Sequence, residues 1–215
     1  MRKKLYLGLT LVIIFIIFTS TLLFVDRRGV GPNSSIVGYA TINLWFHNLT
    51  GVNWVMYTIT DYGGIIPILL GLFFGGVGFI QLISRKNIKK VDFELIILGL
   101  FYIIVFLIYL LFEYVVINRR PVIIDGYLEA SYPSSTTFLS ITFLLSAIIP
   151  IKRYIKNKKV QMILIIISYL YMSFLVVGRI VSGVHWLTDI IGSILIGFGL
   201  VNLYEYIIIR IKSNL

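Results

Sequence analysis

Six long apolar stretches alternate along the chain with short polar segments in which Lys and Arg gather. A transmembrane helix needs about 20 mostly apolar residues to cross roughly 30 Å of hydrocarbon. The stretches run over residues 5–25, 65–84, 93–117, 137–151, 160–177 and 186–209. The fourth is short and needs residues 134–136 or part of the following basic run to reach full length. The pattern predicts an all-α, polytopic six-helix transmembrane bundle that forms a single membrane domain over residues 1–215.

Composition agrees with a membrane environment and narrows the chemistry. Hydrophobic residues make up 59% of the chain, charged residues 13%, and the mean hydropathy is +0.97, which excludes an ordinary soluble surface. The absence of cysteine excludes disulfides, thiolate metal sites and a cysteine nucleophile. Neither a metal nor a cofactor is expected. The net charge of +10 arises from short basic runs between apolar stretches, so nucleic acid is not an expected partner.

The distribution of Lys and Arg predicts the orientation. With a cytoplasmic N-terminus, 14 of the 19 basic residues lie on the cytoplasmic side, as the positive-inside rule requires. The outer ones are all arginines: Arg27, Arg28, Arg119, Arg120 and Arg179. We therefore expect an integral protein of a bacterial cell membrane, surrounded by membrane lipids, with cytoplasmic termini and outer segments at residues 26–64, 118–136 and 178–185. The first stretch is long for a signal peptide and lacks an A-x-A site, so a retained helix is expected.

The third outer segment ends in a paired histidine and aspartate. His185 and Asp189 are four residues apart, a spacing that puts both side chains on one face of a helix. The carboxylate then accepts the proton of one ring nitrogen and leaves the other nitrogen free to attack or to donate. The spacing also fits an interfacial histidine beside an acid that favours a helix N-terminus. On these residues alone both interpretations stay open.

The second outer segment adds donors for an anion. Arg119 and Arg120 precede a proline, and Ser134, Ser135 and Thr136 stand just before the fourth apolar stretch. Arginine offers a planar fork of donors that matches phosphate oxygens, and hydroxyls with backbone N–H groups at a helix start form an anion site. The alternative is a basic loop that faces anionic headgroups. Together with the third segment, these residues favour a site for a lipid phosphate.

The order of the pieces resembles the three signature blocks of the type 2 phosphatidic acid phosphatase and haloperoxidase superfamily. The matching pieces are Arg-Pro, then Pro-Ser, then Arg with His six residues later and Asp four beyond, within roughly residues 111–199. The resemblance implies six helices with the blocks on the outer face and a reaction through a phosphohistidine. It assigns the attack on phosphorus to His185, the orientation of that ring to Asp189, and phosphate binding to Arg120, Arg179 and Ser134.

Two departures from the family pattern affect this site. Glu113 stands seven residues before Arg120, where the first block has Lys, and Ser135 and Thr136 replace the Gly and His of the second block. That histidine is the family's general acid, and a Thr hydroxyl cannot replace it because its pKa lies far above the working pH. Arg119 is a candidate for the missing cation. Glu113 is a candidate for a substitute proton carrier or for a partner of an outer arginine.

The missing acid influences the expected substrate. General acid catalysis contributes about 10²- to 10⁴-fold in rate, and a phosphate leaving group needs this help less than an alkoxide does. The sequence therefore favours a lipid phosphatase or diphosphatase, with polyprenyl pyrophosphates such as undecaprenyl pyrophosphate preferred. The alternatives are a catalytically weakened relative that binds or transports lipid phosphates or serves as a partner subunit, and an unrelated channel or transporter. Haloperoxidase activity is not expected, since it uses the same absent histidine. His47 is expected at the membrane interface, away from the site.

Overall fold

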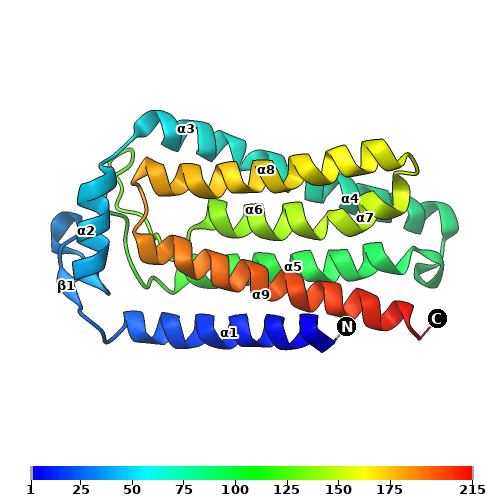
Figure 1. The fold of residues 1–215 in the computed structure, drawn as a ribbon, viewed down its shortest axis with the longest axis horizontal. Coiled ribbons are helices and arrows are strands. Elements are labelled where there is room, and N and C mark those ends of the chain that lie inside the picture. Colours follow the sequence, from blue (N-terminus) through cyan, green and yellow to red (C-terminus); the bar gives the residue numbers. More distant parts are fainter. Residues whose placement is uncertain (1, 215) are drawn as a thin grey trace.

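The computed structural model describes residues 2–214, which form a bundle of long helices lying side by side (Figure 1). Six segments of the described chain are long and apolar enough to cross a membrane: Arg2–Leu22, Trp54–Arg85, Phe93–Tyr114, Ser135–Tyr154, Lys158–Ser182 and Leu187–Lys212. The predicted six-helix transmembrane bundle is therefore confirmed, and the protein is an integral membrane protein.

The helices follow one another with short connections. The first span is α1 (Arg2–Leu22), the second combines α3 (Trp54–Gly63) and α4 (Ile65–Arg85), and the third is α5 (Phe93–Tyr114). The fourth combines α6 (Ser135–Ser146) and α7 (Ile148–Tyr154), and α8 (Lys158–Ser182) and α9 (Leu187–Lys212) complete the bundle. Between α1 and α3 lie the antiparallel strands β1 (Arg28–Gly29) and β2 (Ile36–Val37), the 3₁₀ turn η1 (Pro32–Ser34) and helix α2 (Ala40–Thr50). A second 3₁₀ turn, η2 (Ile88–Lys90), links α4 to α5.

Helix α6 occupies the centre of the bundle, which explains why its apolar stretch is short. In the most apolar part of the span Ser135–Tyr154, 72% of the residues are buried, against 17–39% in the other spans. The neighbours of α6 are α4, α5, α8 and α9. Because helices surround it in place of lipid, α6 tolerates hydroxyls: Thr142 bonds back to the Phe138 carbonyl, and Ser146 bonds to the Tyr102 hydroxyl. The low hydropathy of this span is thus a consequence of its burial.

Several boundaries differ from those expected. The third span ends at Tyr114, before residue 117, and Ser135 and Thr136 belong to α6 and not to the preceding loop. Helix α8 continues past residue 177 to Ser182 and therefore contains Arg179. The expected outer segment 26–64 is largely folded, since it includes α2 and α3. Hydropathy cannot separate a loop from a helix end whose polar side chains are paired inside the protein.

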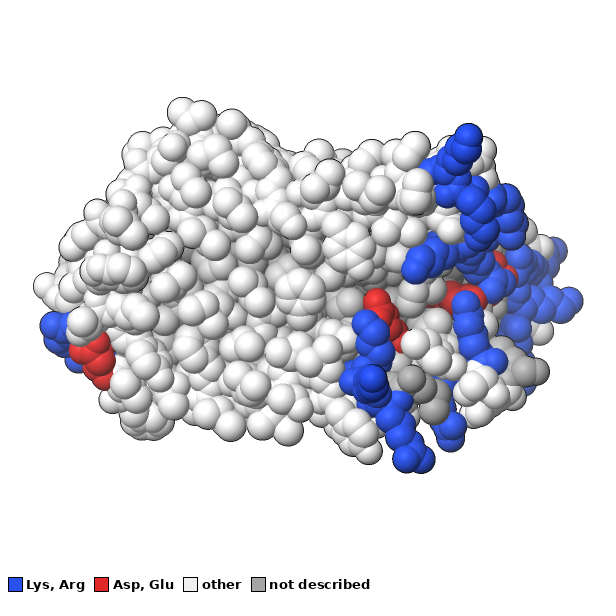
Figure 2. Space-filling view, viewed as in Figure 1, with Lys and Arg blue, Asp and Glu red and all other residues white. Residues whose placement is uncertain are grey.

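The two ends of the bundle differ in charge. Both termini lie at one end, together with η2 and the α7–α8 connection; we call it the terminal end (Figure 1). Lys and Arg gather there, whereas the opposite end, with α2 and the two strands, shows few charged side chains in the same view (Figure 2). We call this opposite end the cap end.

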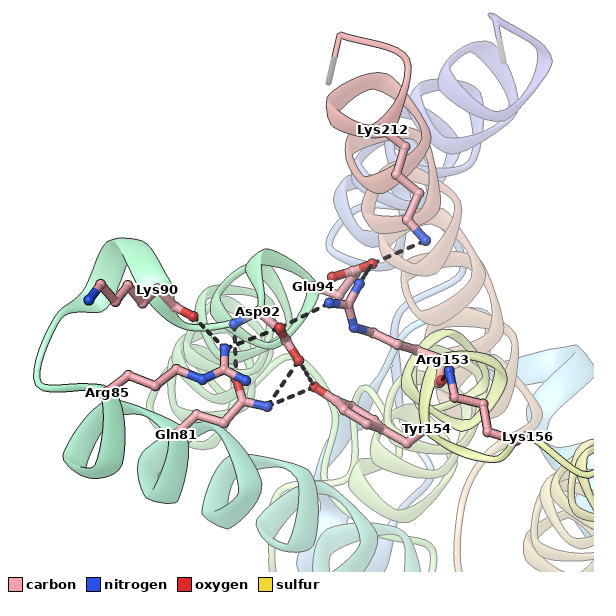
Figure 3. A network of polar contacts seen from close by, with 9 residues as sticks. All are labelled: Gln81, Arg85, Lys90, Asp92, Glu94, Arg153, Tyr154, Lys156 and Lys212. Atoms are coloured by element: carbon pink, nitrogen blue, oxygen red, sulfur yellow. Dashed lines mark hydrogen bonds and ion pairs between the residues drawn. The ribbon is translucent and has the colours of Figure 1, made fainter.

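A network of ion pairs joins α4, α5, α7 and α9 at the terminal end (Figure 3). The side chain of Glu94 has no exposed surface; its Oε1 is 2.7 Å from Arg153 Nη1 and 3.1 Å from Lys212 Nζ. Asp92 is 2.9 Å from Arg153 Nη2 and accepts a hydrogen bond from the Tyr154 hydroxyl at 2.5 Å. Burial raises the pKa of Asp92, but the bonds from Tyr154 and other donors outweigh it and hold the pKa below its ordinary value. These pairs tie the four helix ends together.

Candidate functional site

Five of the predicted site residues converge at the cap end. Arg120 lies in the α5–α6 connection, Ser134 directly precedes α6, Arg179 is in the last turn of α8, His185 is in the following turn, and Asp189 is in the first turn of α9. We call these five residues the site cluster. All of them are buried, with exposed fractions between 0% and 7%. They meet because α6, α8 and α9 pack against one another.

His185 lies between a carboxylate and a guanidinium. Its Nδ1 is 3.4 Å from Oδ2 of Asp189, and the same oxygen accepts a hydrogen bond from the backbone N–H of Trp186 at 2.9 Å. Its Nε2 is 3.3 Å from Nη1 of Arg120. Because a guanidinium only donates, Nε2 must accept, and the neutral ring carries its proton on Nδ1, which lies at ion-pair distance from Asp189 and forms no hydrogen bond within the described chain. Nε2 therefore keeps a lone pair on the side of the arginines.

The surroundings of His185 favour its neutral form. Burial is the largest cause, and the charges of Arg120 and Arg179 act in the same direction, so the pKa of His185 is lowered well below its ordinary value. A neutral imidazole is able to act as a base or a nucleophile. The side chains of Asn118 and Ser131 lie beside the Asp189 carboxylate and complete its polar surroundings.

Each arginine of the site cluster is held by a carboxylate from another segment. Nε of Arg120 is 2.9 Å from Oε2 of Glu129, and Nη2 of Arg179 donates to Oδ1 of Asp61 at 2.9 Å. The Arg179 guanidinium also lies over the ring of Tyr57, 5.1 Å from its centroid, in a cation–π contact. Tyr57, Asp61 and Glu129 are not among the predicted site residues, because no spacing in the sequence relates them to the signature blocks.

Several buried donors of the site cluster lack a partner among the described residues. Nε and Nη1 of Arg179 and the hydroxyl of Ser134 are three of them. Nε of Arg120 and Nδ1 of His185 also form no hydrogen bond within the described chain, although they lie at ion-pair distance from Glu129 and Asp189. A buried donor without an acceptor costs about 1–3 kcal/mol, and more if it is charged, so such groups call for a ligand or a solvent partner. Two N–H groups of one guanidinium and a nearby hydroxyl suit an anion with several oxygens. The geometry therefore supports an anion site beside His185.

The other predicted phosphate-binding residues lie at the edge of the site cluster. Arg119 is exposed; its Nη1 donates to the Leu128 carbonyl at 2.7 Å, and its own carbonyl accepts from the Trp186 indole at 2.7 Å. No hydrogen bond or ion pair joins its guanidinium to the site cluster within the described part of the chain. Ser135 and Thr136 form the first turn of α6 and line an adjacent groove.

This groove has a volume of about 330 Å³ and lies between α3, α4, α5 and α6. Its lining is mostly apolar and includes Ile65, Ile68, Phe106, Leu139 and Phe143. Ile65 and Phe106 are also exposed on the outside of the bundle, where lipid lies. The polar part of the lining is formed by Ser135, Thr136 and Asp61, the partner of Arg179. The groove thus connects a lipid-facing surface with the edge of the site cluster.

His47 lies in α2, outside the site cluster. Its ring packs edge-on against the indole of Trp186, with 5.5 Å between the ring centroids. Burial lowers the pKa of His47, and a hydrogen bond with the backbone of Gly183 opposes this effect. His47 therefore packs beside the turn that carries His185, and within the described chain no hydrogen bond joins its side chain to the site cluster.

Comparisons with known proteins agree with this geometry. The family model described as PAP2 superfamily matches residues 53–212. A solved structure, the crystal structure of the first transmembrane PAP2 type phosphatidylglycerolphosphate phosphatase from Bacillus subtilis, superposes with a TM-score of 0.67 at 19% sequence identity, over 96% of this chain and 98% of that one. No curated protein matches the sequence. The likeness in structure concerns the fold, and the family model covers most of the chain and all three signature blocks; the protein belongs to the PAP2 superfamily.

Proposed function

We propose that the protein is a membrane lipid phosphatase or diphosphatase that acts through a phosphohistidine at His185 and favours polyprenyl pyrophosphates. One observation carries the proposal: the buried imidazole has Asp189 3.4 Å from Nδ1 and Arg120 3.3 Å from Nε2, and Arg179 of the same cluster has two donors without a partner in the described chain. A histidine with only a packing role needs neither an orienting carboxylate nor two arginines at its other face. The fold of a membrane lipid phosphatase family supports a lipid phosphate as the substrate class.

Each side chain of the site cluster has a distinct role in the proposed reaction. A phosphoryl group binds to Nε and Nη1 of Arg179 and to the Ser134 hydroxyl, and its charge draws the Arg120 guanidinium away from Nε2. The lone pair of Nε2 attacks phosphorus, while Asp189 stabilises the positive charge on the ring. The bond to the leaving oxygen breaks. Water then attacks the phosphohistidine, so that the phosphorus–nitrogen bond breaks, phosphate leaves and His185 is regenerated.

The groove beside the site cluster supports a substrate with a long apolar tail. Its apolar walls are exposed toward lipid, and its polar part lies next to Arg179 through Asp61. A lipid in this position keeps its apolar tail against Ile65 and Phe106 and its headgroup near Arg179. A substrate that enters the groove directly from the membrane does not have to move its apolar tail through water.

The preference for pyrophosphates rests on Thr136. This residue stands in the groove at the position of the family's acid, and its hydroxyl does not titrate near neutral pH. A phosphate leaving group is a weaker base than an alkoxide and departs with less help. Hydrolysis of phosphatidate is therefore expected to be slower than hydrolysis of a polyprenyl pyrophosphate.

The charge distribution supports a cytoplasmic terminal end and an outer site. Since the chain has no cysteine, single cysteines report the orientation without background. With a membrane-impermeant maleimide on intact cells, Gly126→Cys in the α5–α6 connection should be labelled, and Lys89→Cys in η2 only after permeabilisation. The reverse pattern would place the site on the cytoplasmic face.

The function itself is tested by phosphate release from protein purified in detergent, without added metal. Farnesyl pyrophosphate and phosphatidate are the two substrates, and His185→Ala is the inactive reference. His47→Gln is the matched control, because His47 packs on Trp186 outside the site cluster and its replacement should leave most of the activity. Wild-type rates no higher than those of His185→Ala on both substrates would refute hydrolysis. Vanadate binding without release would then identify the weakened, lipid-phosphate-binding relative.

A further inference from the structure

A second groove lies between those halves of α4 and α5 that are nearer the terminal end. Its volume is about 510 Å³, and the residues that line it are apolar or glycine. Three of them are Gly75, Gly78 and Gly99, and a Cβ added at Gly75 or Gly99 would meet no atom within 4 Å. The missing side chains of these glycines leave a hollow in the surface between the two helices. We call this hollow the α4–α5 groove.

The α4–α5 groove opens toward lipid and extends over one leaflet. Phe79, Leu100 and Ile103 line it and are more than half exposed on the outside of the bundle. Along α5 the lining runs from Leu95 to Ile103, which at 1.5 Å per residue is about 12 Å. Half of a hydrocarbon core of roughly 30 Å has a similar thickness. The groove therefore matches a lipid tail better than a helix that crosses the whole membrane.

Three lysines lie where the groove reaches the terminal end. Ile88 and Val91 line the groove at the connection between α4 and α5, and Lys89 and Lys90 stand between them, in η2. Lys86 directly follows the last residue of α4. All three lysines are exposed, and we call them the lysine triad. The apolar groove thus ends at a cluster of three positive charges.

The lysine triad has no counter-charge within residues 2–214, where none of its ammonium groups forms a hydrogen bond or an ion pair. The nearest carboxylates in the sequence, Asp92 and Glu94, are paired with other basic side chains of the terminal-end network. The Lys90 side chain points away from this network, while its backbone carbonyl accepts a hydrogen bond from Arg85 (Figure 3). The three ammonium groups therefore remain available to an anion from outside the chain.

We propose that the α4–α5 groove binds the acyl tail of an anionic phospholipid from the leaflet at the terminal end, and that the lysine triad binds its phosphate headgroup. Basic side chains next to a membrane helix attract anionic lipids, and the groove gives one such lipid a fixed position. Basic residues that only set the orientation of a membrane protein need no groove beside them. The site is separate from the site cluster and does not depend on the proposed phosphatase function.

A second copy of the chain suits the groove less well than a lipid. A twofold contact through the groove would bring the lysine triad of one copy next to the lysine triad of the other, because such a contact uses the same surface twice. Like charges that face each other across an interface oppose association. The charge at the end of the groove therefore favours an anionic partner.

The test is native mass spectrometry of the full chain, purified in a neutral detergent. The protein is titrated with phosphatidylglycerol, which is anionic, and with phosphatidylcholine, which has the same phosphate but no net charge. Wild type should bind phosphatidylglycerol at least about tenfold more tightly. Replacing all three residues of the lysine triad by glutamine should weaken this binding about tenfold or more, since each basic residue near an anionic lipid contributes about fivefold in affinity.

The matched control removes three other charges from the terminal end. It combines Arg2→Gln and Lys3→Gln in α1 with Arg210→Gln in α9, all at exposed positions. The net charge falls by the same amount as in the variant of the lysine triad, but the α4–α5 groove is untouched. Phosphatidylglycerol affinity should change by less than about threefold.

A second pair of variants tests the groove itself. Gly99→Leu fills it and should weaken phosphatidylglycerol binding about tenfold, whereas Gly76→Leu, which also has open space for a Cβ but is not part of the lining, should not. Arg179→Lys changes the site cluster and should leave this affinity within about threefold of wild type. Loss of binding in Arg179→Lys would place the lipid at the cap end and overturn the proposal.

Three other results would also overturn it. They are equal affinities of wild type for the two lipids, equal losses in the two triple variants, and unchanged binding in Gly99→Leu. A wild-type dimer that retains no lipid and dissociates in Gly99→Leu would assign the groove to a second copy instead. Failure of the phosphate-release assay would overturn the proposed function and leave this lipid site intact.

Discussion

Replacing Arg179 by lysine is the sharpest test of the anion site. The guanidinium of Arg179 is buried, bound to Asp61 through Nη2 and stacked on Tyr57, and it presents Nε and Nη1 without a partner in the described chain. Lysine keeps the positive charge but loses the planar fork. It can maintain the contact with Asp61 or reach a phosphate oxygen, but it cannot donate two parallel bonds to the anion.

The expected loss follows from these contacts. Each hydrogen bond to a charged group contributes about 1.5–3 kcal/mol net, and the retained charge of lysine offsets part of the loss of two such bonds. We therefore expect a loss of about 2–3 kcal/mol in the free energy of binding. Because about 1.4 kcal/mol corresponds to a tenfold change in affinity, vanadate should bind Arg179→Lys roughly 30- to 150-fold more weakly than wild type.

Arg119→Lys is the matched control for this measurement. Arg119 is an arginine of the cap end too, but it is exposed and donates to the Leu128 carbonyl, so its replacement should change vanadate affinity by less than about threefold. Affinities are measured by titration calorimetry on protein in detergent, and thermal unfolding verifies that both variants are folded. Equal changes in the two variants, or a change below threefold in Arg179→Lys, would show that Arg179 does not bind the anion.

Three further outcomes are expected. Since burial and the two arginines lower the pKa of His185, its nucleophilic neutral form persists to lower pH, and the acidic limb of kcat/KM should lie below pH 6.5; a midpoint above 6.5 would contradict this. Arg153→Ala should lower the free energy of unfolding by about 2 kcal/mol in thermal melts, because Glu94 keeps only Lys212, and Glu94→Gln should recover part of the loss. Gly183→Ala places a Cβ 1.8 Å from a backbone oxygen and should weaken vanadate binding, whereas Gly126→Ala, also at positive φ but in open space, should not.

The six spans could be predicted because lipid leaves little choice: every crossing segment must be a long apolar helix. The spacing of His185 and Asp189 likewise predicts that their side chains meet, and the structure brings Nδ1 and Oδ2 to 3.4 Å. They do not share a helix face, however, because His185 lies in the turn before α9 and only Asp189 is in the helix. The start of α6 could not be predicted in the same way. Its first turn holds Ser135 and Thr136, which read as loop residues by hydropathy but lie against protein at the centre of the bundle.

The terminal-end network escaped prediction for a related reason. Glu94 is the second residue of α5 and stands next to a basic run, so the sequence is equally consistent with a solvated carboxylate at a helix start. Its complete burial depends on Arg153 from α7 and Lys212 from α9, which are distant in sequence. Pairings between helices have no local period, and only the packed structure reveals them.

Asp61 and Glu129, which pair with Arg179 and Arg120, reduce the cost of burying the two guanidinium groups. A guanidinium as buried as that of Arg179 is costly without a counter-charge. Asp61 supplies that charge through one nitrogen, and because its own side chain is about half exposed, water can solvate it when a phosphate takes over the guanidinium. Glu129 stands in the same relation to Arg120. Under the proposed function, such a site could bind and release phosphate without leaving a buried charge unpaired in either state.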